Sequence, residues 1–271
     1  MTRTKLADRV LPSYTKGEEI FNMTSHIVGG ALGIAATTLC VIMASINKNV
    51  YGIVTGSIYG FTIILLYVIS SIYHGLKANT TAKKVFQILD HCSIFILIAG
   101  TYTPIALCNI RNLDTASGWW LFGIIWFAAT LGIVLNAIDL KSTKKFSMIS
   151  YLLMGWTIIF KFELLLNSMN LNGIILIALG GIVYTIGAIL YGLGKKKKYF
   201  HSIFHLFFQT KFHSFYFPLA FLKILHNKKT NSIKFEPTLK FYQLIFSSHY
   251  IFILSFFIFF VKTFFINVMK M

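Results

Sequence analysis

Apolar runs of about 20 residues recur along this chain, and they constrain its fold more than any other feature. A helix of that length crosses about 30 Å of hydrocarbon, the thickness of a bilayer core. Six runs predict membrane helices over residues 25–46, 51–74, 85–108, 119–138, 146–167 and 173–193, and a seventh helix is expected from about residue 199. The chain is therefore predicted to be an all-α, polytopic membrane protein, a bundle of seven transmembrane helices.

The composition agrees with a membrane protein. Charged residues make up 12% of the 271 residues, about half the usual fraction in soluble domains. The net charge of +17 comes from basic residues that lie between the apolar runs, where such residues set membrane topology. Membrane lipids are thus the expected partners, and nucleic acid is not. Three cysteines, Cys40, Cys92 and Cys108, lie in or beside apolar runs and are expected to be buried without forming disulfides.

The distribution of basic residues predicts the orientation. The N-terminal segment and the loops after the second, fourth and sixth helices each carry several Lys or Arg, whereas the other loops carry at most one. Because basic loops stay in the cytoplasm, residues 1–24 are predicted to be a cytoplasmic segment, followed by a transmembrane domain over 25–207 in the plasma membrane. The first 25 residues contain no apolar stretch of the kind found in a cleaved signal peptide.

This orientation brings the end of the second helix to the membrane face at which the third and seventh helices begin. His74 closes the second helix and Asp90 opens the third. His201 and His205 open the seventh and share one helical face, because they are four residues apart. Three imidazoles and a water form a catalytic zinc site, so these three histidines are candidate ligands. Asp90 and Ser70 are candidate catalytic residues: Asp90 can take a proton from the water, and Ser70 can hydrogen-bond the substrate or that water.

A structural interpretation stays open beside this functional one. Histidine and aspartate near helix ends can also lie in the headgroup region, where they are solvated at little cost. Ionisable groups that converge at one depth of a membrane favour a functional site. His91 is predicted to lie outside that site, because it follows Asp90 directly and points about 100° away around the helix.

Pro104 bears on the shape of the third helix. It closes the segment "GTYTP" at residues 100–104. Since proline removes a backbone donor, this segment is expected to kink or end the helix.

Five motifs extend these observations: "EEIFNMTSH" (18–26), "SSIYH" (70–74), "LDHCSIFILIAGTYTP" (89–104), "YLLMGW" (151–156) and "FHSIFH" (200–205). Through their order and spacing the chain resembles the haemolysin III family, within the progestin and adipoQ receptor superfamily. The resemblance implies a seven-helix fold, a cytoplasmic N-terminus and zinc near the inner leaflet. The implied ligands are His74, His201 and His205, with Asp90 and Ser70 completing the site. The superfamily is also similar to membrane ceramidases, which hydrolyse lipid amides.

Two functional hypotheses follow. The first is a zinc-dependent hydrolase that acts on membrane lipid amides or esters at the inner leaflet. The second is a non-enzymatic protein, either a receptor-like regulator of the membrane or a cytolytic haemolysin, in which zinc is structural. The residues of the site are the same in both hypotheses, so the sequence leaves the choice open.

The chain departs from the family pattern after about Phe207. Lys211 falls about 15 Å beyond His201 along a helix, near the bilayer centre, where a lysine costs about 2.5–3.5 kcal/mol on insertion scales. Residues 208–271 are predicted to form a basic, Phe-rich tail with one further membrane segment at 241–266. A second hypothesis is that the tail is translated from an altered reading frame, which would leave this copy inactive.

Overall fold

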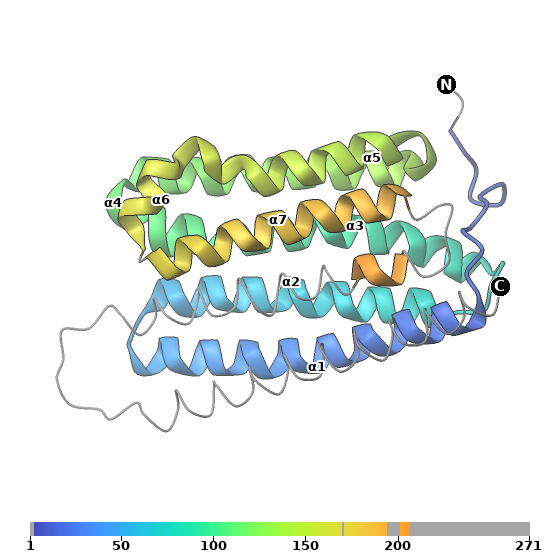
Figure 1. Cartoon of the computed structure of the whole chain (residues 1–271), viewed down its shortest axis with the longest axis horizontal. Helices are drawn as coiled ribbons and strands as arrows, with labels where there is room; N and C mark the ends of the chain where they lie inside the picture. The colour runs from blue at the N-terminus through green and yellow to red at the C-terminus, as the bar shows by residue number, and fades with distance from the viewer. Residues whose placement is uncertain (1–2, 170, 194–200, 206–271) are drawn as a thin grey trace, which may run out of the picture. The chain divides into compact units, whose positions relative to one another are not determined.

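The computed structural model describes residues 3–169, 171–193 and 201–205, all within one compact unit, Met1–Asn227. Helices make up nearly all of this part of the chain, and the long ones lie side by side in Figure 1. In order they are α1 (Lys16–Ile46), α2 (Val50–Gly75), α3 (Thr81–Pro104), α4 (Arg111–Leu113), α5 (Thr115–Trp156), α6 (Phe162–Ser168) and α7 (Leu171–Leu193).

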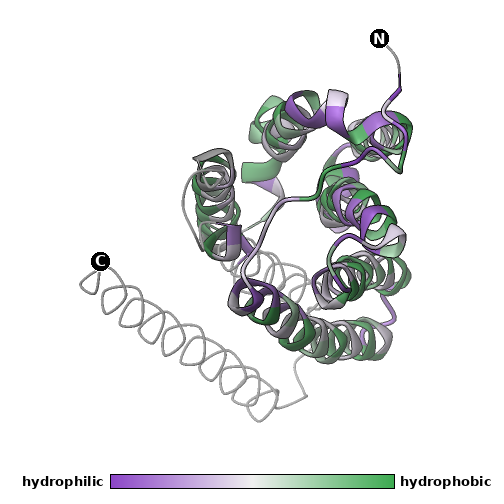
Figure 2. Ribbon diagram, turned by 90° about the vertical axis from the view of Figure 1, so that its right-hand side faces the viewer, coloured by the Kyte–Doolittle hydropathy of each residue, from purple (hydrophilic) through white to green (hydrophobic). Residues whose placement is uncertain are grey.

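Four stretches of the described residues are long and apolar enough to cross a membrane, and Gly173–Ile189 is a shorter apolar helix. Figure 2, which looks along the helices, shows hydrophobic residues in each of the long helices. Large apolar side chains such as Phe127 and Phe160 are 72% and 85% exposed, as expected where helices contact lipid. The prediction of an all-helical membrane protein is thereby confirmed. Of the predicted seventh helix, the structure describes only the helical residues 201–205. The predicted tail 208–271, with its membrane segment 241–266, lies outside the described residues.

The predicted start of the first helix at residue 25 was wrong, because α1 begins at Lys16. The reason is a capping box in "TKGE". The Thr15 side chain accepts a hydrogen bond from the backbone N–H of Glu18, and the Glu18 carboxylate accepts one from the backbone N–H of Thr15. This pair satisfies two backbone donors that an uncapped helix start leaves free. The polar motif before the first apolar run therefore belongs to α1.

The predicted break between the fourth and fifth helices is confirmed at Asp139 (φ −156°, ψ 90°), but the connection is shorter than the predicted loop, because the helix resumes directly after this residue. The Asp139 carboxylate accepts hydrogen bonds from Thr4 N and Oγ1 (3.1 and 3.0 Å). Beside this break, Asn136 contacts Ser147 Oγ (2.5 Å) and Tyr151 Oη (3.4 Å). The two halves of α5 therefore lie next to each other, and Figure 1 shows the chain reversing its direction there.

Irregular turns end two other helical stretches. α3 ends at Pro104 and continues as a π-helical turn over Ile105–Ile110, so the prediction that this proline kinks or ends the helix is confirmed. After α5, a 3-10 segment covers Thr157–Lys161. Tyr102 Oη accepts a hydrogen bond from the backbone N–H of Ile158 (3.1 Å). This contact satisfies a backbone group that the regular helix no longer serves.

Gly132 allows α5 to approach α3, the helix that carries Asp90. A Cβ atom at Gly132 would lie 2.3–2.6 Å from ring carbons of Phe95. Phe95 is fully buried and packs against Tyr151, with ring centroids 4.4 Å apart. Since the ring has little room to move, we expect Gly132→Ala to lower the free energy of unfolding by about 1–3 kcal/mol, the usual cost of overpacking.

Gly123 supplies the matched control on the same helix. A Cβ atom at Gly123 would meet no atom within 4 Å in the described structure. Alanine is favoured over glycine inside a helix by about 0.5–1 kcal/mol, so Gly123→Ala is expected to be neutral or stabilising. Thermal unfolding of both variants in detergent measures the difference. Equal stability of the two variants would contradict the close approach at Gly132.

Candidate metal site

Three buried histidines meet at the end of the bundle where α1 begins. His26 lies in α1, His74 lies in the last turn of α2, and His205 lies in the short helix 201–205. One ring nitrogen from each residue lies within 4.8 Å of those from the other two. Figure 1 shows that α2 ends, and the helix 201–205 lies, near the end at which α1 starts. We call these three residues the histidine cluster.

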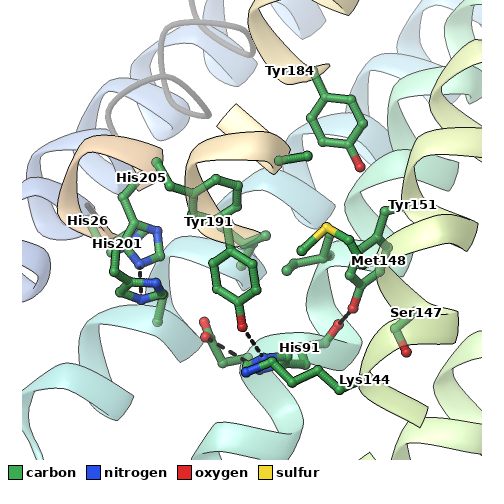
Figure 3. A pocket seen from close by; sticks show the side chains of 16 residues that line it. His26, His91, Lys144, Ser147, Met148, Tyr151, Tyr184, Tyr191, His201 and His205 are labelled. Atoms are coloured by element: carbon green, nitrogen blue, oxygen red, sulfur yellow. Dashed lines mark hydrogen bonds and ion pairs between the residues drawn. The ribbon is translucent and has the colours of Figure 1, made fainter. Parts of the chain in front are cut away.

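The cluster includes two of the three predicted ligands, and the third lies beside it. Nε2 of His201 is 2.9 Å from Nε2 of His205, as the dashed line in Figure 3 marks. The ring centroids of His74 and His201 are 5.7 Å apart. The structure thus brings His74, His201 and His205 together and adds His26.

The ring nitrogens of the cluster fit a metal ion. In the described part of the chain, neither nitrogen of His26 has a hydrogen-bond partner, and Nε2 of His74 has none, although all three atoms are buried. An unsatisfied buried polar atom costs about 1–3 kcal/mol, and most such atoms therefore have a partner. Imidazole nitrogen is also a preferred ligand of zinc. Zinc coordination would satisfy Nε2 of His74, and one nitrogen of His26 where that residue is a fourth ligand.

The spacing of His201 and His205 supports this fit. Two nitrogen ligands about 2.0–2.1 Å from a tetrahedral zinc ion lie roughly 3.3 Å apart. The Nε2 atoms of these two histidines are 2.9 Å apart. The two nitrogens therefore lie close to the separation that two ligands of one ion require.

Tyr14 covers the site from the N-terminal segment. Its ring stacks on His201, with centroids 4.9 Å apart and planes 19° apart, and its centroid lies 5.9 Å from that of His74. Burial raises the pKa of the Tyr14 hydroxyl well above its ordinary value, so the group stays neutral. The segment is held in place partly by Arg9, whose Nη2 donates a hydrogen bond of 3.1 Å to Gln87 Oε1 in α3. Tyr14 therefore shields the histidines on this side.

A cavity adjoins the cluster, and Figure 3 shows residues around it. Both predicted catalytic residues, Asp90 and Ser70, line this cavity together with His26, His201 and His205. Asp90 is 7% exposed, and Ser70 is fully buried. Apolar residues form much of the remaining wall: Leu66, Ile94, Met148, Ala188 and Phe204.

His91 does not belong to the histidine cluster, as predicted, but its side chain lines the same cavity. Its Nδ1 lies 3.0 Å from the carbonyl oxygen of Gln87, and its Nε2 lies 3.3 Å from Tyr191 Oη. Both ring nitrogens are therefore engaged. His91 is better suited to shaping the cavity wall than to binding a metal.

His26 was not among the predicted ligands. The signal that points to it is the capping box, which starts α1 at Lys16 and places His26 well inside the helix. Asn22, His26 and Gly29 then follow at intervals of four and three residues and share one helical face. All three are buried. A helix that starts at residue 25 hides this pattern.

Known proteins share this sequence organisation. A family model described as "Haemolysin-III related" matches residues 14–216, most of the chain. The chain belongs to the haemolysin-III-related family. This finding confirms the family that the five motifs indicated. The match ends at residue 216, so most of the tail lies beyond it.

Individual relatives support the assignment. "Hemolysin-3" of Bacillus cereus is 37% identical over 190 residues, which cover 70% of this chain and 84% of that protein. "Hemolysin-3 homolog" of Bacillus subtilis (strain 168) is 36% identical over 194 residues, covering 72% and 89%. A more distant homologue, "Monocyte to macrophage differentiation factor" of Rattus norvegicus, is 27% identical over 219 residues, covering 79% and 84%. This mammalian protein belongs to the progestin and adipoQ receptor superfamily.

Proposed function

We propose that this haemolysin III family protein is a zinc-dependent hydrolase of lipid amides or esters in the plasma membrane. The observation that carries the proposal is a buried histidine cluster beside a largely apolar cavity that also contains a carboxylate. Three protein ligands leave a position on zinc for water or substrate. An apolar cavity suits an acyl chain. Hydrolysis of an acyl bond uses both features together.

Each residue of the site has a separate role in this proposed reaction. His74, His201 and His205 would hold a zinc ion, which would supply Lewis acidity toward a carbonyl and make a water molecule more acidic. The Asp90 carboxylate accepts the proton of the attacking water and returns it to the leaving group. The Ser70 hydroxyl donates a hydrogen bond to the substrate oxygen. The apolar wall binds the acyl chain and limits the access of bulk water.

The same proposal places the site near the inner leaflet, with the N-terminus in the cytoplasm. The support is the concentration of Lys and Arg at the end of the bundle that holds the cluster. Lys83 and Lys84 at the start of α3, and Lys144 and Lys145 just after the break in α5, all lie at this end.

A second candidate function is non-enzymatic, with zinc as a structural ion in a membrane regulator or a haemolysin. One observation favours it: the cluster takes its histidines from α1, α2 and the helix 201–205. A metal there would tie three segments together. His26 separates the two candidates, because a fourth histidine ligand closes a zinc site and leaves no position for water.

Metal analysis of the purified full chain tests the proposal. We expect about one zinc ion per wild-type chain, as a single mononuclear site requires. His201→Ala is expected to lose this zinc, because it removes one of three ligands. His26→Ala is expected to retain it, since His26 would lie beside an open zinc site without binding the ion.

The other outcomes decide between the candidates. Loss of zinc in both variants would indicate a closed site with four histidines and would favour the structural role. Wild-type protein that is active without any metal would contradict the hydrolase proposal.

A further inference from the structure

Glu19 is half-buried beneath the histidine cluster and has no part in the reaction proposed above. It lies in the first turn of α1, directly after Glu18 of the capping box. Its Oε2 is 2.6 Å from Nδ1 of His74, and its Oε1 accepts a hydrogen bond of 2.7 Å from Nζ of Lys83. Each carboxylate oxygen therefore holds a different partner.

Lys83 fixes this carboxylate in place. The lysine is only 2% exposed, although it carries a charge. Its Nζ also donates a hydrogen bond of 2.9 Å to the carbonyl oxygen of Leu76, the residue that caps the end of α2. Glu19 is thus held between the end of α2 and the start of α3. A charged carboxylate is the form that pairs with a buried ammonium.

The contact with Glu19 determines which nitrogen of His74 carries a proton. An ionised carboxylate only accepts hydrogen bonds. The hydrogen between the two groups therefore belongs to Nδ1 of His74, and Nε2 of the neutral ring has none. Within the described residues, Nε2 is also the ring nitrogen of His74 that is buried without a hydrogen-bond partner.

We propose that Glu19 is a positioning residue, which, held by Lys83, keeps His74 in the Nδ1-protonated tautomer with Nε2 free to bind the metal. The inference rests on the proposed function, because it requires a metal at the cluster. A carboxylate on the outer nitrogen of a ligating histidine orients the ring and raises its basicity, and removing such a partner typically weakens metal binding about 10–100-fold.

A purely structural role for the Glu19–Lys83 ion pair predicts a different result. An ion pair that only ties α1 to α3 affects the stability of the metal-free protein. It leaves the Zn²⁺ affinity of the folded protein unchanged. Affinity and stability must therefore be measured separately.

The test is the Zn²⁺ affinity of the full chain in detergent, measured by competition with a chelator. Glu19→Gln is expected to bind Zn²⁺ about 10–100-fold more weakly than wild type. This variant leaves the Lys83 ammonium buried without a counter-charge and can fail to fold. The double variant Glu19→Gln/Lys83→Met replaces the ion pair with a neutral pair and is expected to show the same loss of affinity. Thermal unfolding of the metal-free proteins reports their stability.

Glu18→Gln is the matched control. It makes the same chemical change one residue away, where the side chain accepts hydrogen bonds from Thr15 as part of the helix cap. Glutamine also serves in a capping box. Glu18→Gln is therefore expected to keep the wild-type Zn²⁺ affinity.

Nitrogen NMR of isotope-labelled histidine in metal-free wild-type protein gives a second readout, which does not depend on the folding of the Glu19 variants. His74, assigned from the signal lost in His74→Ala, is expected to carry its proton on Nδ1. A proton on Nε2 of His74, or wild-type Zn²⁺ affinity in the double variant, would overturn the proposed role of Glu19 and leave the metal site itself untouched. A wild-type chain that binds no Zn²⁺ would overturn the metal site as well as this inference.

Discussion

Replacing His205 with alanine is expected to abolish zinc binding under conditions that load the wild-type protein. His205 belongs to the histidine cluster and also to the ligand set that the sequence predicted. Structural zinc sites in peptides bind with about 10–16 kcal/mol. If three ligands share this energy equally, the loss of one costs about 3–5 kcal/mol, which is at least a ~100-fold loss of affinity. Zinc content after dialysis and a chelator competition measure the effect.

His91→Ala is the control for this experiment. His91 lines the same cavity, but both of its ring nitrogens have partners, the carbonyl of Gln87 and the hydroxyl of Tyr191. Removing it deletes an imidazole without deleting a predicted ligand. We expect His91→Ala to keep its zinc. His205 belongs both to the histidine cluster and to the predicted ligands His74, His201 and His205. Zinc retained by His205→Ala would therefore exclude both sets of ligands.

Asp90→Asn is expected to reduce hydrolysis about 10²–10⁴-fold while zinc stays bound, because general acid–base catalysis contributes about that factor. Asparagine keeps the size of the side chain but cannot take up a proton at neutral pH. Asp90 is not among the proposed ligands, so its loss leaves the histidines unchanged. Turnover of fluorescent ceramide and acyl-ester substrates, together with zinc content, provides the two readouts.

Asp8→Asn serves as the matched control, since Asp8 is exposed in the N-terminal segment. It makes the same chemical change and should leave hydrolysis at the wild-type level. Equal turnover by Asp90→Asn and wild type would remove Asp90 from the mechanism. A membrane phenotype that survives Asp90→Asn, in a protein that hydrolyses no acyl lipid, would instead support the non-enzymatic candidate.

The helices could be predicted where an apolar run ends at a polar turn. The prediction of 51–74 differs from α2 (Val50–Gly75) by one residue at each end. The errors arose where hydrogen bonds rather than hydropathy set the boundary. Thr15 and Glu18 start α1 inside a polar segment, and one residue, Asp139, turns the chain within α5. Hydropathy indicates how many residues of a segment lie in the bilayer, and it carries no information about such local hydrogen bonds.

The candidate site followed from sequence because membrane helices alternate in direction. Alternation brings the end of α2 to the level of the start of α3 and of the helix 201–205, so His74 was expected at the same depth as His201 and His205. The neighbours of these histidines did not follow in the same way. The contacts of Glu19 with His74 and of Tyr14 with His201 join residues far apart in the chain.

The sequence by itself thus determined the class of protein, its family and the end of the bundle at which the polar residues gather. The physical reason is that a bilayer imposes one length and one axis on every helix, which a linear pattern can show. Only the tertiary structure decided which of these residues touch, including the addition of His26 to the cluster and of Glu19 to His74. Those contacts depend on how each helix is rotated about its axis, and close packing at positions such as Gly132 sets that rotation.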